Sequence, residues 1–320
     1  MKRSMITLVG TALMATMLPL AVPVAAADVA CGDVVTTDIK LTEDLGPCSG
    51  DGLIAGASGI VIDLGGHRIT GAAGSAGGVR IPSPYGQVEV RGGTISGFSQ
   101  GVVLTQTSGN HVWRLRLVAN GRGIDLGGGN SSNVIEKNAA VDNTADAIRV
   151  DASDDNVVQK NTVVGSPYGI SVSNGADGNL IAKNEVSASR GVPGLGISVF
   201  GNADGNVVEK NHVTGMARVG IYVLSESDET LISKNDSIGN GWDGILVETG
   251  TTGTDIDKNT ASDNGDDGID VEAVGTTLTK NRTNENADLG IEAVAGVEDG
   301  GGNRASGNGD AAQCTNVACG

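Results

Sequence analysis

Aromatic residues are scarce in this sequence, at only 2% of 320 residues. Compact globular cores rely on large rings for buried area, so this scarcity argues against such a core. Hydrophobic residues still make up 39% of the chain, mostly as Val, Ile, Leu and Ala, which argues against disorder. Glycine is abundant, with 51 residues. An ordered chain with small aliphatic side chains and many sharp bends is therefore expected.

Positive charge is also scarce. Lys and Arg total 21 against 38 Asp and Glu, which gives a net charge of −17. Binding to nucleic acid or to an anionic membrane surface needs a positive field, so both are excluded as expected partners. The composition is compatible with a cation-binding protein or with a soluble exported one.

The N-terminal segment is predicted to be a signal peptide over residues 1–27. Lys2 and Arg3 precede an apolar run, and Ala25, Ala26 and Ala27 then supply the small residues that a signal peptidase cuts after. The alternative is a retained membrane anchor, which the prolines near the end of the run disfavour. We therefore expect a secreted protein, extracellular or periplasmic, with no membrane contact after cleavage.

Cysteine is absent between Cys48 and Cys314, and all four cysteines lie near the ends of the chain. An even number in an exported chain indicates disulfides, and the economical pairs are Cys31–Cys48 and Cys314–Cys319. A metal site is the alternative. The absence of a C-x-x-C motif or a neighbouring His argues against it.

The middle of the chain is a repeat. A Lys-Asn pair recurs seven times, at spacings of 22 to 27 residues, and a Gly-Ile or Ala-Ile pair recurs in step with it. A constant period in the low twenties is typical of a solenoid. The repeated asparagines are Asn138, Asn161, Asn184, Asn211, Asn235, Asn259 and Asn281.

Each repeat predicts short β-strands rather than helices. The residue three before each repeated Asn is aliphatic, and each Gly-Ile is followed by an Ile-x-Val-type alternation that buries one face of a strand. Stacked repeats make a single-stranded parallel β-helix, an all-β fold, of roughly ten coils. Parallel crossovers are overwhelmingly right-handed, so we expect a right-handed helix. The expected organisation is an N-terminal cap over 28–58, repeats over 59–302 and a C-terminal tail over 303–320.

The Lys-Asn pair requires a bend in each coil. Strict alternation would send the lysines inward, where they cannot be buried, so the chain must turn before the Asn. We expect the Asn to take the left-handed conformation of that bend and its amide to bond to the amides above and below. The seven lysines form a column that is either a track for an acidic glycan or a solvated stripe that prevents edge association.

The repeats G-I-x-V and N-x-[VI]-x-x-N-x-V, with the opening from Leu45 to Gly71, resemble the secreted right-handed parallel β-helix proteins of bacteria. That group shares its fold with pectate lyases, polygalacturonases, alginate epimerases and a copper-associated periplasmic protein. Their signatures are missing here: the sequence has no G-H-G, no D-P-H-D and no R-x-P-x-x-R. The resemblance therefore implies the fold, whereas it transfers no catalytic residue.

An outward-facing patch is the candidate binding site. The outward positions after each Gly-Ile are mostly polar, whereas the coils from Gly196 to Glu248 place apolar side chains together, and the one repeat insertion is expected to overhang them. The alternative is that this loop buries the patch by packing. The candidate substrate-binding residues are Arg149, Asp151, Tyr168, Arg190, Phe200, Arg218, Tyr222, Asp243, Leu246 and Glu248.

Acidic residues in neighbouring coils could hold Ca²⁺, although no known calcium motif is present and no cofactor is required. The candidate ligands are Asp243, Asp266, Asp267 and Asp270. We expect a monomer that binds an extended polysaccharide on the outer face of the central coils, as a lyase, hydrolase, epimerase or binding protein. The alternative is a non-catalytic matrix or structural β-solenoid.

Overall fold

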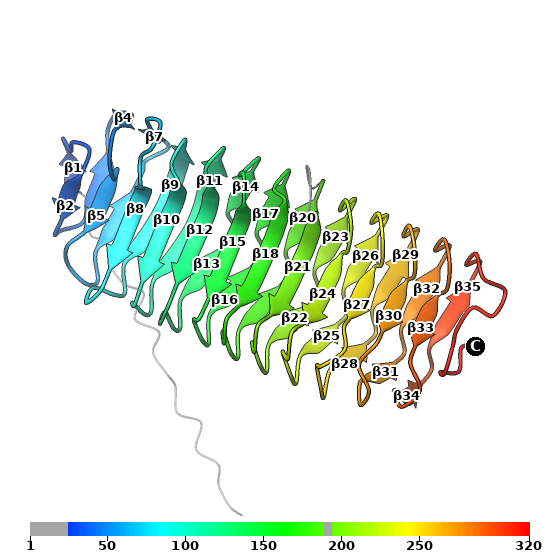
Figure 1. The fold of residues 1–320 in the computed structure, drawn as a ribbon. Coiled ribbons are helices and arrows are strands. Elements are labelled where there is room, and N and C mark those ends of the chain that lie inside the picture. Colours follow the sequence, from blue (N-terminus) through cyan, green and yellow to red (C-terminus); the bar gives the residue numbers. More distant parts are fainter. Residues whose placement is uncertain (1–24, 189–193) are drawn as a thin grey trace, which may run out of the picture.

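The computed structural model describes residues 25–188 and 194–320, and all regular secondary structure within these ranges is β-strand. Figure 1 shows the strands stacked side by side along one axis, from the blue N-terminal strands to the red C-terminal ones. Strands of successive coils pair in parallel along the stack. The molecule is therefore a parallel β-solenoid, as the repeat spacing predicts.

One face of the solenoid is a twelve-stranded sheet. Each strand comes from a successive coil, so the sheet gives the number of coils. Its strands, in order, are β2 (Asp33–Val35), β5 (Leu53–Ala55), β8 (Gly77–Pro82), β10 (Gln100–Thr105), β12 (Arg122–Gly127), β15 (Asp146–Asp151), β18 (Tyr168–Ser173), β21 (Leu195–Phe200), β24 (Ile221–Leu224), β27 (Ile245–Val247), β30 (Ile269–Val271) and β33 (Ile291–Ala293).

The other faces form one 23-stranded sheet made of two parallel runs, which the long strands β9 (Glu89–Ser96) and β11 (His111–Val118) join. The first run also contains β1 (Ala25–Ala27), β3 (Ile39–Leu41), β6 (Val61–Asp63), β13 (Val134–Glu136), β16 (Val157–Gln159), β19 (Leu180–Ala182), β22 (Val207–Glu209), β25 (Leu231–Ser233), β28 (Asp255–Asp257), β31 (Thr277–Thr279) and β34 (Glu298–Gly301). The second contains β4 (Leu45–Cys48), β7 (Arg68–Gly71), β14 (Ala139–Val141), β17 (Thr162–Val164), β20 (Glu185–Ser187), β23 (His212–Thr214), β26 (Asp236–Ile238), β29 (Thr260–Ser262), β32 (Arg282–Asn284) and β35 (Arg304–Ser306).

The solenoid has twelve coils rather than the expected ten, because the segment 28–58 contains strands of its own. β2 pairs with β5, and β5 pairs with β8, so this segment continues the twelve-stranded sheet. Ala25–Ala27, the expected peptidase site, forms β1 and pairs with β3. No helix in the described ranges is long and apolar enough to cross a membrane.

The core is the aliphatic column that the alternation predicts. Ile170, Ile197 and Ile221 follow one another across three coils, and all are fully buried. The glycine before each of these isoleucines lies against the next coil. A Cβ on Gly196 would sit 2.3 Å from the carbonyl oxygen of Gly220, which explains why a glycine precedes the Ile there.

The repeated asparagines form a buried ladder, as expected. Asn161 Nδ2 donates to Asn184 Oδ1 at 3.0 Å, and Asn184 Nδ2 donates to Asn211 Oδ1 at 3.0 Å. The expected backbone conformation was wrong, however. The left-handed residue is the preceding lysine, with φ of 55° at Lys160 and 57° at Lys183. The Asn side chain must point inward to join the ladder, so the bend falls one residue earlier, where the lysine can stay exposed.

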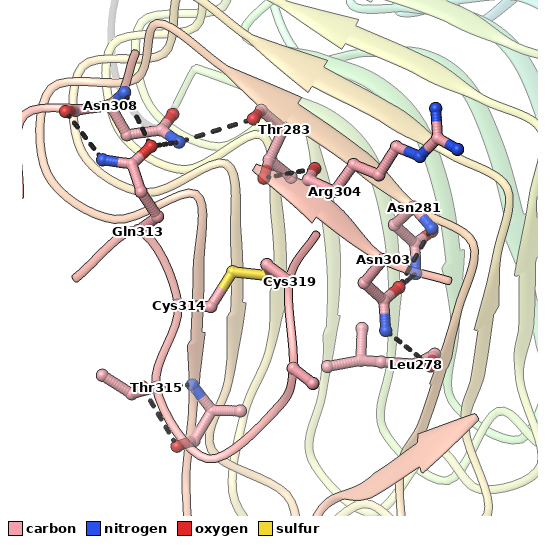
Figure 2. Close-up of a disulfide and its surroundings, with 12 residues drawn as sticks. Leu278, Asn281, Thr283, Asn303, Arg304, Asn308, Gln313, Cys314, Thr315 and Cys319 are labelled. Atoms are coloured by element: carbon pink, nitrogen blue, oxygen red, sulfur yellow. Dashed lines mark hydrogen bonds between the residues drawn. A yellow bond between two sulfur atoms is a disulfide. The ribbon is translucent and has the colours of Figure 1, made fainter. Parts of the chain in front are cut away.

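Both expected disulfides are present, Cys31–Cys48 and Cys314–Cys319. Figure 2 shows the C-terminal disulfide, which closes a short loop within the tail. Backbone bridges from Cys314 to Ile291 and from Cys319 to Asn303 place this loop against the last coils. There Gln313 takes the place of a further ladder residue, because its Oε1 accepts a hydrogen bond from Asn308 Nδ2 at 2.9 Å. The tail thereby satisfies amides that the end of the stack would leave open.

Candidate functional site

The candidate site lies on the outer face of the twelve-stranded sheet. Three outward positions recur in each coil: the residue before the Gly of Gly-Ile, the residue after its Ile, and the residue two further on. Strand register brings the residues of successive coils side by side, so that Asp146 neighbours Tyr168 and Tyr168 neighbours Leu195. Along the axis, these three columns give a zone of paired charges, an apolar zone and an acidic zone.

A hollow of about 260 Å³ opens where the paired charges meet the apolar zone, on β15, β18 and β21. Two half-buried rings, Tyr168 and Phe200, contribute to its wall. The remaining lining is polar and comprises Asp146, Arg149, Asp151, Ser171, Ser173 and Asn174. Rings together with fixed hydrogen-bonding groups are the usual composition of a small-ligand site.

Hydrogen bonds fix the polar lining of the hollow. Ser171 Oγ donates to Asp146 Oδ1 at 2.6 Å. Asp151 Oδ1 accepts from Ser173 Oγ at 2.8 Å and from Asn174 Nδ2 at 2.6 Å. The acceptor groups are thus held in place before any ligand arrives, which lowers the entropy that binding would cost.

Two arginines sit among three carboxylates beside the hollow. Arg149 Nη2 lies 2.7 Å from Asp151 Oδ2, and its Nε lies 3.2 Å from Asp125 Oδ1. Arg122 Nε lies 3.1 Å from Asp146 Oδ2. Asp125 is only 3% exposed, and this burial raises its pKa, against the opposing effect of the Arg149 and Arg122 charges.

The apolar zone is a small cluster separate from the core. Leu195, Val219 and Leu246 are buried side by side, with Tyr168 and Tyr222 packed against them. The Tyr222 hydroxyl donates a hydrogen bond to Glu248 Oε1. Burial, and then this bond to Glu248, raises the pKa of Tyr222. The hydroxyl therefore stays protonated and acts as a donor at neutral pH.

The acidic zone contains three carboxyl groups whose pKa values lie near neutrality. Burial, followed by the negative charge of neighbouring acids, raises the pKa of Asp243 to about 6 and that of Asp270 to about 7. Burial, followed by a side-chain hydrogen bond with Glu292 and the charge of neighbouring acids, raises the pKa of Asp267 to about 8. One carboxylate oxygen from each lies within 4.8 Å of the others. Asp266, Asp267 and Asp288 form a second such group. A cluster of this kind could bind a metal ion, and carboxyl groups that titrate near neutrality suit proton transfer.

The structure brings most of the expected binding residues onto this one face, although it divides them among the three zones. Arg149, Asp151, Tyr168 and Phe200 line the hollow. Tyr222 and Leu246 belong to the apolar cluster, Glu248 bonds to Tyr222, and Asp243 lies in the acidic zone. Arg218 stacks on the exposed Trp242, with its guanidinium carbon 3.7 Å from the ring centroid. Arg190, and with it the expected overhang of the insertion, lies outside the described residues.

Sequence reasoning found only part of the first outward column, because it named Tyr168 and Asp243 but not Asp146, Leu195 and Val219. Each of these three residues precedes a Gly-Ile or Ala-Ile pair. β15 and β21 begin at Asp146 and Leu195, and Val219 packs with Leu195 in the apolar cluster. Their constant position before the pair is the signal that would have found them.

Most of the chain matches a known family. A family model described as a right handed beta helix region matches residues 45–186 and 177–308. The chain belongs to this right-handed β-helix family. Comparison with curated protein sequences finds no match.

Solved structures with this fold include several carbohydrate enzymes. The A-module of a mannuronan C-5 epimerase from Azotobacter vinelandii superposes with a TM-score of 0.68 at 16% identity, covering 89% of each chain. The DFA-IIIase of Arthrobacter chlorophenolicus A6 superposes with a TM-score of 0.61 at 12% identity, covering 76% of this chain and 71% of the DFA-IIIase chain. A double mutant of a periplasmic alginate epimerase superposes with a TM-score of 0.54 at 16% identity, covering 85% of this chain and 77% of the epimerase chain. At these identities the likeness establishes the right-handed β-helix fold alone.

Proposed function

We propose that this right-handed β-helix protein binds an extended polysaccharide along the outer face of its twelve-stranded sheet. The observation that carries the proposal is the hollow between Tyr168 and Phe200, where two rings stand beside fixed carboxylate, hydroxyl and amide groups. Ring faces pack against the apolar faces of sugars, and the polar groups bond to their hydroxyls.

Two further observations support this proposal. The columns continue in register beyond the hollow, so a polymer can follow them from coil to coil, about 4.8 Å at each step. The solved structures that share the fold include enzymes named as alginate and mannuronan epimerases. The two disulfides support an extracytoplasmic location, where such polymers occur.

Catalysis on the bound chain is the second candidate function. On the same face, Asp243 lies in the coil of Leu246, and Asp267 and Asp270 lie in the next coil. All three have pKa values near neutrality. Such groups can donate or accept protons in hydrolysis, elimination or epimerisation. If the protein binds a polysaccharide but does not convert it, it is a polysaccharide-binding module. If it neither converts nor binds one, it is a structural solenoid.

The test is affinity electrophoresis against a panel of neutral and uronate polysaccharides. Wild-type protein is retarded by at least one polymer, and Tyr168→Ala and Phe200→Ala each weaken that binding about tenfold, because a sugar-facing ring is lost. Tyr85→Ala, in the bend after β8, is the matched control and keeps wild-type affinity. The same mixtures are assayed for reducing ends and unsaturated products, which would reveal catalysis.

Two results would contradict the proposal. One is migration that no polymer in the panel changes. The other is unchanged affinity in both ring variants, which would place the ligand elsewhere on the solenoid.

A further inference from the structure

Resting on the proposed function, we infer that the polysaccharide of this face is neutral, and that Asp125, Asp146 and Asp151 make the face reject uronate polymers. Three of the expected binding residues, Arg149, Arg190 and Arg218, would each suit a uronate carboxylate. The geometry of the hollow argues against that role for Arg149.

The cations at the hollow are already neutralised. Arg149 places its guanidinium between Asp125 and Asp151, and Arg122 places its own beside Asp146. Two arginines against three aspartates leave a net charge of 2 − 3 = −1 at this position. A uronate carboxylate would have to displace one of these pairs.

Displacing Arg149 would be costly because of Asp125. That carboxylate is 3% exposed, so water cannot replace Arg149, and only Arg122 Nη1 at 3.5 Å and the Gln100 side-chain amide would remain beside it. Weakening the pairing of a buried carboxylate is destabilising. The protein therefore holds Arg149, and its displacement by a second anion is unfavourable.

The groups that remain at the hollow suit neutral sugars. Asp146 and Asp151 accept hydrogen bonds, and each carboxylate has room for more than the donors it has now. A sugar hydroxyl can donate to them. A uronate carboxylate has no proton to donate at neutral pH and would meet like charge.

The rest of the face adds to the rejection. Among the described residues, the three outward columns from β24 to β33 contain no Lys or Arg. Arg218, which directly precedes the first of these columns, stacks on the Trp242 ring. The columns do contain the carboxylates of Asp243, Glu248, Asp267, Asp270, Glu272 and Glu292. A polyuronate lying on these columns would place its negative charges next to theirs, and like charges across an interface disfavour binding.

The test compares polymers that differ only in charge. Alginate and polygalacturonate are each assayed beside their carboxyl-reduced forms, in which every uronate has become a neutral sugar. A chelator is present, so that no divalent cation bridges the carboxylates. Binding of each reduced form is expected to be tighter than that of its parent by about tenfold or more, because like-charge repulsion is removed.

Asp151→Asn is the informative variant, since it releases one side of Arg149 while keeping the hydrogen bonds to Ser173 and Asn174. It should bind uronate polymers more tightly than wild type does. Asp236→Asn, exposed on β26 and outside this face, removes the same charge and should leave uronate binding unchanged.

The outcomes separate the two claims. Tighter binding of a parent uronate than of its reduced form by the wild-type protein would overturn this inference and leave the proposed function standing. Equal uronate affinity in Asp151→Asn and Asp236→Asn would also overturn it, because Arg149 would then not be the restrained cation. If no polymer of the wider panel binds at all, the proposed function itself fails.

Discussion

At the scale of single residues, the Lys-Asn pair shows what a sequence pattern leaves open. Its spacing predicts a ladder of buried amides, which Asn161 and Asn184 form. It does not say which residue bends, because both residues could occupy the turn. Lys160 and Lys183 adopt the left-handed conformation. The Asn side chains are bonded inside the stack, whereas the Lys side chains have no partner there and can occupy the exposed turn.

The acidic zone also makes a prediction at this scale. Asp243, Asp267 and Asp270 have pKa values above that of an ordinary Asp, so the folded protein holds their protons more tightly than the unfolded chain does. Their contribution to stability is complete near pH 4 and is lost as the pH rises through about 6 to 8. The melting temperature should therefore rise by several degrees as the pH falls from about 8 to about 5.

Asp267→Asn isolates this effect from the overall charge of the protein. The amide oxygen can still accept the bond from the Leu289 N–H, now 2.6 Å long, while the repulsion disappears. The variant should melt above wild type near pH 8 and close to it near pH 5, unlike the control Asp236→Asn. The same difference in melting temperature between variant and wild type at every pH would contradict the assignment.

Calcium binding by these carboxylates stays a prediction. Added Ca²⁺ should raise the melting temperature of wild type and not that of Asp267→Asn.

At the scale of strands, the alternation of apolar and polar residues predicted the buried columns correctly, but it predicted the ends of the strands less well. Ile170 and Ile197 point inward because Ile-x-Val repeats with a period of two. The hollow depends on Tyr168 and Asp146, which precede the Gly or Ala and belong to the same strands. Strand ends depend on contacts between coils, which a single repeat does not contain. Tyr168 was among the expected binding residues, whereas Asp146 becomes visible only when the position before the pair is compared across coils.

The asparagine ladder, which links neighbouring strands, makes a prediction about stability. Asn211→Ala removes the Oδ1 that receives both the backbone N–H and the Nδ2 of Asn184. Each buried donor left without a partner costs about 1–3 kcal/mol, so the loss of partners for two donors should lower the free energy of unfolding by roughly 2–6 kcal/mol in chemical denaturation. His212→Ala, one residue along and exposed, is the control and should change stability little. Similar unfolding midpoints for the two variants would show that the ladder does not carry this energy.

At the scale of the whole molecule, the repeat period predicted the solenoid, and both disulfides followed from the position of the cysteines. The number of coils was underestimated because the first coils, over 33–55, lack the Lys-Asn mark and bend at glycines instead. The division of the outer face into paired charges, an apolar cluster and acids could not be predicted from any one repeat. It arises only when twelve coils are placed in register.

The most direct test of a polysaccharide site on this face is a crystal structure with an oligosaccharide of a polymer that the protein binds. The proposed function predicts a sugar ring in the hollow between Tyr168 and Phe200, hydrogen-bonded to Asp146 or Asp151, with the chain continuing along the outward columns toward Tyr222. Electron density for the sugar along the lysine column, away from the twelve-stranded sheet, would contradict it.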